Sequence, residues 1–127
     1  MAGLKLGLLD WWPWRAWRVV GYVDAADEVP DRLPRTAIVV VGTAKTPKWI
    51  AFDCPCRRGN RILLAAQAAE GALNPFKAAR PKWIVQAERP ATLWPSVDAW
   101  HGTQRCHYVI QKGEVKWAID PPTPQTH

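Results

Sequence analysis

The sequence predicts a mainly β (α+β) fold, a small zinc-stabilised antiparallel sheet domain with one short helix. Three observations lead to this prediction. Short runs rich in Val, Ile and Trp alternate with turns that contain Gly or Pro, which is typical of strands. The 127-residue chain is long enough for one domain with a modest core. Its three cysteines, together with one histidine, would complete the tetrahedral ligand set of a zinc ion.

The expected strands follow from β-branched and aromatic runs that end at turn residues. The last of them is a hairpin, because two such runs are joined by a short turn that contains glycine, "QKGE". The expected strand regions are 17–23, 36–44, 48–54, 81–87 and the hairpin 106–119.

The short helix is expected over residues 61–73, where Ala and Leu dominate. Gly71 and then Asn74 and Pro75 would end it. The predicted organisation has three parts. These are a Trp-rich N-terminal segment packed on the same domain (1–27), a zinc-binding β domain (28–120) and a disordered tail (121–127).

The charge balance limits the classes of partner. The chain carries 17 Lys and Arg against 11 Asp and Glu, a formal net charge of +6, which favours acidic surfaces or nucleic acid. The N-terminal tryptophans alternate with arginines and could stack on bases, but we favour packing on the domain or on a partner chain. No apolar run approaches the roughly 20 residues of a membrane span, and no signal peptide is evident. The odd number of cysteines argues against a fully paired secreted scaffold, so we expect a cytoplasmic protein.

The candidate metal ligands are Cys54, Cys56, Cys106 and His107. The first two cysteines flank a proline, a spacing unfavourable for a relaxed disulfide but suitable for facing one ion across a tight turn. His101 is the alternative fourth ligand, because side chains of adjacent strand residues such as Cys106 and His107 point to opposite faces. A site with four protein ligands would be structural rather than catalytic. The other interpretation is that the cysteines are only small buried residues.

A second constellation is typical of nucleophilic catalysis. Ser96 or a cysteine could act as the nucleophile, His107 or His101 as the base, and Asp98 as the carboxylate that orients the base. Ser96 follows a proline, so ordinary turn hydrogen bonding is the competing interpretation. No catalytic residue is assigned from the sequence alone.

The order of short motifs over residues 28–118 resembles a family of small bacterial and phage proteins known as domain of unknown function 6527. The motifs are "VPDRLPRTAIVVVG", "PKWIAFDCPCRRGNRILL", "RPKWIV", "TLWPSV" and "CHYVIQKGEVKW". The resemblance implicates Cys54 and Cys56, Ser96 in the Pro-Ser motif, and Cys106 with His107. Where the family commonly has a third cysteine in the first motif, this chain has Arg58.

The resemblance implies a zinc-binding protein, in some members linked to bacterial ubiquitin-like conjugation systems. The primary functional prediction is thus a zinc-stabilised accessory or protein-interaction module that acts with such a system or with a phage. The first alternative is a peptidase that processes a ubiquitin-like protein through Ser96 and a histidine. The second alternative is nucleic-acid binding.

Overall fold

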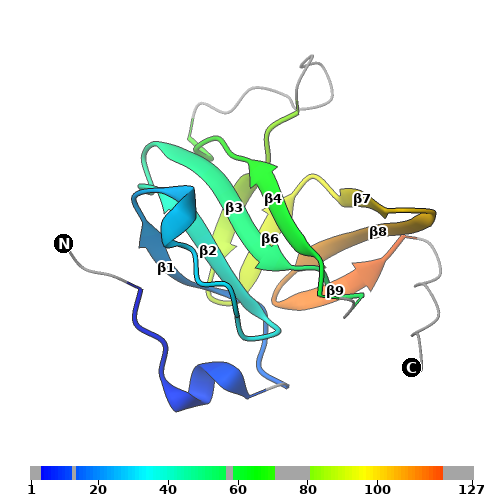
Figure 1. The fold of residues 1–127 in the computed structure, drawn as a ribbon. Coiled ribbons are helices and arrows are strands. Elements are labelled where there is room, and N and C mark those ends of the chain that lie inside the picture. Colours follow the sequence, from blue (N-terminus) through cyan, green and yellow to red (C-terminus); the bar gives the residue numbers. More distant parts are fainter. Residues whose placement is uncertain (1–3, 13, 57–58, 71–80, 119–127) are drawn as a thin grey trace.

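Nine strands form three separate sheets in the computed structural model, which describes residues 4–12, 14–56, 59–70 and 81–118 (Figure 1). The first sheet has the order β1-β2-β3-β4, the second contains β5 and β6, and the third has the order β7-β8-β9. The strands are β1 (Arg18–Val23), β2 (Ala37–Gly42), β3 (Pro47–Asp53), β4 (Arg61–Ala65), β5 (Ile84–Glu88), β6 (Ala91–Trp94), β7 (Val97–His101), β8 (Gln104–Gln111) and β9 (Glu114–Trp117).

The first sheet is built around β2, whose residues from Ala37 to Val41 are all buried. One face of β2 packs into the main core and the other into a smaller cluster with Val23 and Leu33, which explains its uninterrupted apolar run. β1 pairs with β2 in parallel, whereas the other neighbouring strands in the three sheets pair antiparallel. The mainly β prediction is confirmed, but the sheet is not purely antiparallel.

The predicted helix over residues 61–73 is wrong for residues 61–70. Arg61–Ala65 is strand β4, which pairs antiparallel with β3. The side chains of Ile62 and Leu64 are buried, whereas Leu63 between them is 47% exposed. This period-two burial outweighs the helical propensity of Ala and Leu, because it places two apolar residues in the core. Within the described residues, the helical segments are only two 3₁₀ turns, η1 (Leu8–Trp11) and η2 (Ala26–Glu28).

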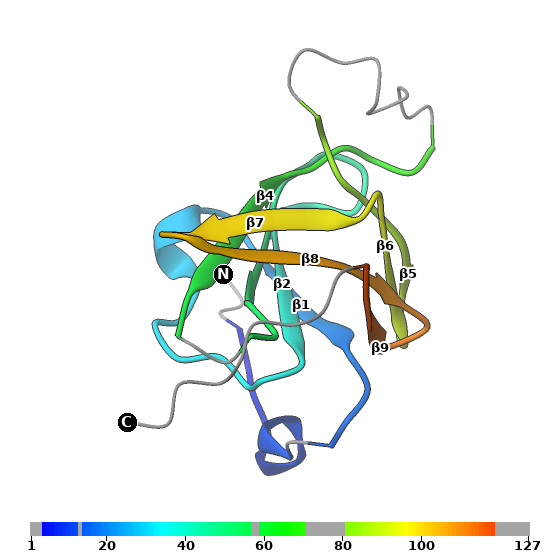
Figure 2. The ribbon, with the colours of Figure 1, turned by 90° about the vertical axis from the view of Figure 1, so that its right-hand side faces the viewer.

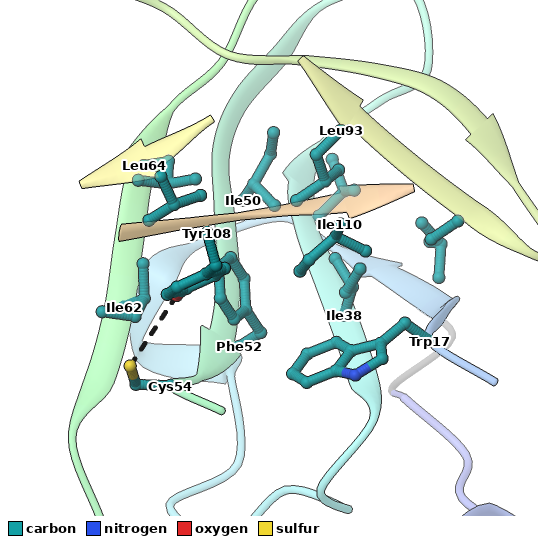
Figure 3. Packing of buried hydrophobic residues seen from close by; sticks show 14 of the residues in the cluster. Trp17, Ile38, Ile50, Phe52, Cys54, Ile62, Leu64, Leu93, Tyr108 and Ile110 are labelled. Atoms are coloured by element: carbon teal, nitrogen blue, oxygen red, sulfur yellow. Dashed lines mark hydrogen bonds between the residues drawn. The ribbon is translucent and has the colours of Figure 1, made fainter. Parts of the chain in front are cut away.

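The third sheet crosses over the first, so that β7 and β8 cover its inner face (Figure 2). The expected hairpin is confirmed as β8 and β9, with Lys112 and Gly113 at positive φ in its two-residue turn. Tyr108 of β8 is fully buried, and its hydroxyl donates to Cys54 Sγ at 3.7 Å. Figure 3 shows this contact at one side of the core and Trp17 at the other. The third sheet is thereby tied to the turn after β3.

A buried arginine, Arg18, links the N-terminal segment to the domain through hydrogen bonds. Arg18 is 3% exposed and donates to the Asp10 carboxylate at 2.9 Å, while Trp17 packs edge-on against Phe52. The remaining tryptophans of the segment do not pack into the core, since Trp14, for example, is 79% exposed. No helix in the part of the chain that the structure describes is long and apolar enough to cross a membrane. The predicted disordered tail lies outside the described residues.

Candidate functional site

The two candidate constellations lie on the two faces of the β7–β8 hairpin. The register pairs Val97 with Tyr108, Asp98 with His107, and Ala99 with Cys106. Because directly opposed residues share a face and neighbours alternate, Cys106 faces the core and His107 faces outward. Burial agrees with this alternation, since Cys106 and Tyr108 are buried and Asp98 is exposed. One hairpin therefore presents an inner face and an outer face with different chemistry.

On the inner face, four ligand atoms lie within 4.8 Å of one another, those of Cys54, Cys56, His101 and Cys106. Cys54 and Cys56 come from the turn between β3 and β4, where the Cys54 amide donates to the carbonyl of Asn60 at 2.8 Å. His101 and Cys106 come from β7 and β8. All three cysteines are free thiols. The turn and the hairpin, about 50 positions apart in sequence, thus meet at this group.

The chemistry of the group fits a zinc ion. His101 Nε2 is buried and has no hydrogen-bond partner among the described residues, an arrangement that is costly unless the nitrogen is coordinated. Burial, followed by the charges of Cys54 and Cys56, raises the pKa of the Cys106 thiol to about 12. Burial also raises the pKa of Cys54. A divalent cation would relieve this repulsion between thiolates, and a set of three sulfurs and one imidazole suits zinc.

The structure places His107 away from this group, although the sequence analysis put it in the ligand set. Its Nε2 lies 3.1 Å from Ser96 Oγ on the outer face of the hairpin. The reason is the regular strand: β8 begins at Gln104 and continues without interruption through residues 106 and 107. Side chains at these two positions must point to opposite faces. His101, the alternative ligand, is the histidine that lies beside the cysteines.

On the outer face, Ser96 and His107 form a serine–histidine pair. Ser96 immediately precedes β7 and lies diagonal to His107, within reach across an antiparallel pair. Asp98 lies directly opposite His107, and its two carboxylate oxygens accept hydrogen bonds from Arg105 at 2.9 and 2.8 Å. The hydrogen bond from Arg105 is the main reason why the pKa of Asp98 is lowered, with a further contribution from the charge of His107.

Two residues that support this pair did not emerge from the sequence analysis. Trp83 Nε1 donates to the carbonyl of Ser96 at 3.1 Å and thereby fixes the backbone at the serine. Arg105 holds Asp98 beside His107. The sequence did carry a signal for each of them. Trp83 stands in the "RPKW" motif, and Arg105 is two positions before His107, hence on the same face of a strand.

Comparison with known proteins and protein families links the chain to a described family. No curated protein and no solved structure matches the chain. A family model described as bacterial ubiquitination-like system serine protease matches residues 25–118, which include both constellations. The match confirms the expected link to a bacterial ubiquitin-like system. With about three quarters of its length covered by that model, the chain belongs to the bacterial ubiquitination-like system serine protease (BubE) family.

Proposed function

We propose that this chain is a serine protease that cleaves a ubiquitin-like protein at its C-terminal tail, with Ser96 as the nucleophile and His107 as the general base. The observation that carries the proposal is the 3.1 Å distance between Ser96 Oγ and His107 Nε2, which lies within the range for proton transfer. The family description names the same reaction class. This was the first alternative from the sequence, and it replaces the accessory module as the primary proposal.

In the proposed reaction, Ser96 Oγ attacks the carbonyl carbon of the scissile bond while His107 Nε2 takes the hydroxyl proton. His107 then gives this proton to the leaving amine, and the acyl group stays on Ser96 as an ester. Water, deprotonated by the same imidazole, hydrolyses the ester and restores the serine. The carboxylate of Asp98 would favour the transient imidazolium, because it lies opposite His107 and Arg105 keeps it in place.

The metal ligands in this proposal are Cys54, Cys56, His101 and Cys106. A bound zinc ion would crosslink the turn after β3 to the β7–β8 hairpin and would supply structural stability, not catalysis, because the protein provides all four ligands. Cys106 and His107 are neighbours in β8. Fixing the inner face of the hairpin therefore also fixes the outer face, where the serine and the histidine must keep their spacing.

The test uses a serine-reactive fluorophosphonate probe and a ubiquitin-like protein fused through its C-terminus to a reporter. Wild type should gain the mass of one probe on Ser96 and release the reporter. Ser96→Ala and His107→Ala should each lower kcat by at least about 100-fold, while they keep the zinc content and lower the melting temperature by no more than about 4 °C, the effect of one lost hydrogen bond. Because the sequence has no other serine, the matched control is Thr103→Ala, which deletes a hydroxyl in the β7–β8 turn. Full cleavage by Ser96→Ala would refute the proposal.

A protein-interaction module remains the second candidate function. It is favoured by the exposed apolar side chains at the N-terminus, among them Leu8 (93%), Leu9 (73%) and Trp14 (79%). Binding of a partner that survives Ser96→Ala and is lost when Leu9 and Trp14 are changed to Ser would support it. The nucleic-acid alternative stays a prediction, and Arg15 and Arg18 contribute little free charge to it, since both pair with Asp10. The domain of unknown function 6527, the phage context and a cytoplasmic location also stay predictions.

A further inference from the structure

The strand that follows Ser96 has an open edge. β7 is the end strand of its sheet and pairs only with β8 within the described residues. Its hairpin closes at the pair of His101 and Gln104, with a two-residue turn between them. Such a closing pair exchanges both backbone hydrogen bonds, and the bonded pairs then recur at every second position. The N–H and C=O groups of Asp98 and Trp100 consequently point away from β8.

These outward backbone groups have no partner among the residues that the structure describes. None of the backbone hydrogen bonds outside the regular pairings involves Asp98 or Trp100, and both side chains are exposed, Trp100 to 63%. The carbonyl of Ser96 points to the same edge but accepts from the Trp83 indole. Unpaired groups at a sheet edge are a template for another extended chain. This edge begins beside the proposed nucleophile and continues away from it for two further donor and acceptor sites.

We propose that the edge of β7 is the substrate-binding strand, and this inference rests on the proposed protease function. An extended tail of the substrate would add to the edge as an antiparallel strand and pair with the backbone of Asp98 and Trp100. The direction follows from the position of Ser96 at the start of β7. With the scissile carbonyl at Ser96, the residues upstream of it lie along β7 on the side of His101. The substrate chain therefore runs from His101 toward Ser96, antiparallel to β7.

This arrangement defines the class of substrate. The residue opposite Asp98 lies two positions, and the residue opposite Trp100 four positions, upstream of the residue opposite Ser96. A substrate therefore needs about four extended residues before the cleavage site, which a flexible C-terminal tail has and a folded loop lacks. The side chain opposite Trp100 would share a face with the exposed indole, on which Arg105 lies at 5.9 Å from the ring centroid. An apolar residue is expected at that position.

The test uses acetylated peptide boronic acids with one, three or five residues, which inhibit serine proteases by adduct formation at the nucleophile. In wild type, inhibition should strengthen by about 30-fold with each extension that adds a pair of backbone hydrogen bonds, which is about fivefold for each bond. The gain from the one-residue to the five-residue inhibitor is then compared between Trp100→Ala, which keeps the backbone N–H, and Trp100→Pro, which lacks it. Proline is tolerated at an edge position whose N–H is not part of the sheet.

We expect this length gain to be about fivefold smaller in Trp100→Pro than in Trp100→Ala. The matched control pair is Val115→Ala and Val115→Pro on β9, the opposite end strand of the same sheet, where the two variants should show equal gains. Zinc content and melting temperature of each variant confirm that it is folded. N-methylation of the five-residue inhibitor at alternate amides provides a second measurement on the unaltered protein. Binding should fall only at those amides that face β7.

The outcomes separate the inference from the proposed function. Adduct formation on Ser96 by every inhibitor without a length gain would overturn the edge-strand inference and leave the protease proposal intact. Equal length gains in Trp100→Pro and Trp100→Ala, together with N-methyl effects that do not alternate, would also overturn it. Failure of all three inhibitors to modify Ser96 would refute the protease proposal, and the inference with it.

Discussion

A comparison of His101→Ala with His107→Ala gives the sharpest test of the assignment of the two histidines to opposite faces of the hairpin. We predict that His101→Ala loses the metal ion and that His107→Ala keeps it. In His101→Ala, one of the four clustered ligand atoms is removed. In His107→Ala, the changed side chain lies on the outer face beside Ser96. Both histidines are half-buried, so the two variants differ in the face that is altered and not in the depth of the residue.

The expected size of the effect follows from linkage between binding and folding. Free zinc at about a thousand times its Kd adds about 4 kcal/mol to the free energy of unfolding. With 127 residues and about 2.1 cal/mol/K of unfolding entropy per residue, this corresponds to about 15 °C in Tm. His107→Ala removes one hydrogen bond, worth about 1 kcal/mol or about 4 °C. The two variants should therefore be separated by about 10 °C.

The assay combines metal analysis of chelator-free protein with thermal unfolding at fixed free zinc. Wild type and His107→Ala should each contain about one zinc per chain, and His101→Ala well under half an equivalent. Only His107→Ala should lose labelling by the fluorophosphonate while it retains its metal. The reasoning would be refuted if His107→Ala lost the metal and His101→Ala retained it, because the ligands would then not follow the strand register.

Three further predictions concern the metal, the fold and the response to acid. Removal of zinc by a chelator should lower both Tm and the proteolytic activity of the protein, and Cys54→Ser should do the same. Activity that persists after complete zinc removal would contradict the structural role of the site. Gly113→Ala should cost about 2 kcal/mol or more in urea unfolding, since φ is +79° and the added Cβ would lie 2.8 Å from two side chains. Gly102→Ala should lower the free energy of unfolding by about 1 kcal/mol, because φ is +65° but no atom lies close to the added Cβ. Equal losses in the two variants would show that the crowding at Gly113 has no effect. Burial would raise the pKa of Asp10, but hydrogen bonds from Arg18 and from a backbone amide bring it below 3.8. Its stabilisation is thus present above that pH and lost as the pH falls further, so Asp10→Asn should be destabilising at about pH 7, and the effect should shrink as acid-unfolding curves go below pH 3.8.

Strands β1, β2, β3, β5, β8 and β9 were predictable from the sequence because their apolar runs are local features. No strand was expected over β6 and β7. The helix over 61–73 was wrongly predicted for residues 61–70, because five alternating residues carry little periodicity and the alanines after them favour a helix. The parallel pairing of β1 with β2 could also not be predicted from the sequence. Both strands were expected, but which neighbour a strand chooses depends on contacts far apart in sequence. In the structure, β2 is buried on both faces between two apolar clusters, which is typical of a strand with a parallel neighbour.

In the candidate site, likewise, the residue types could be read from the sequence but the strand register could not. The sequence supplied the candidate residue types for two sites, but it predicted no strand over residues 97–105 and left both histidines open for both roles. The deciding feature is the tight turn of Gly102 and Thr103, where Gly102 has a φ of +65°. A two-residue turn there makes residues 101 and 104 a pair and so fixes the phase of the whole hairpin. A turn longer by one residue would bring His107 to the inner face beside the first two cysteines and carry Cys106 outward. Which histidine serves as the proposed metal ligand and which as the proposed general base is therefore determined by the length of this turn more than by the histidines themselves.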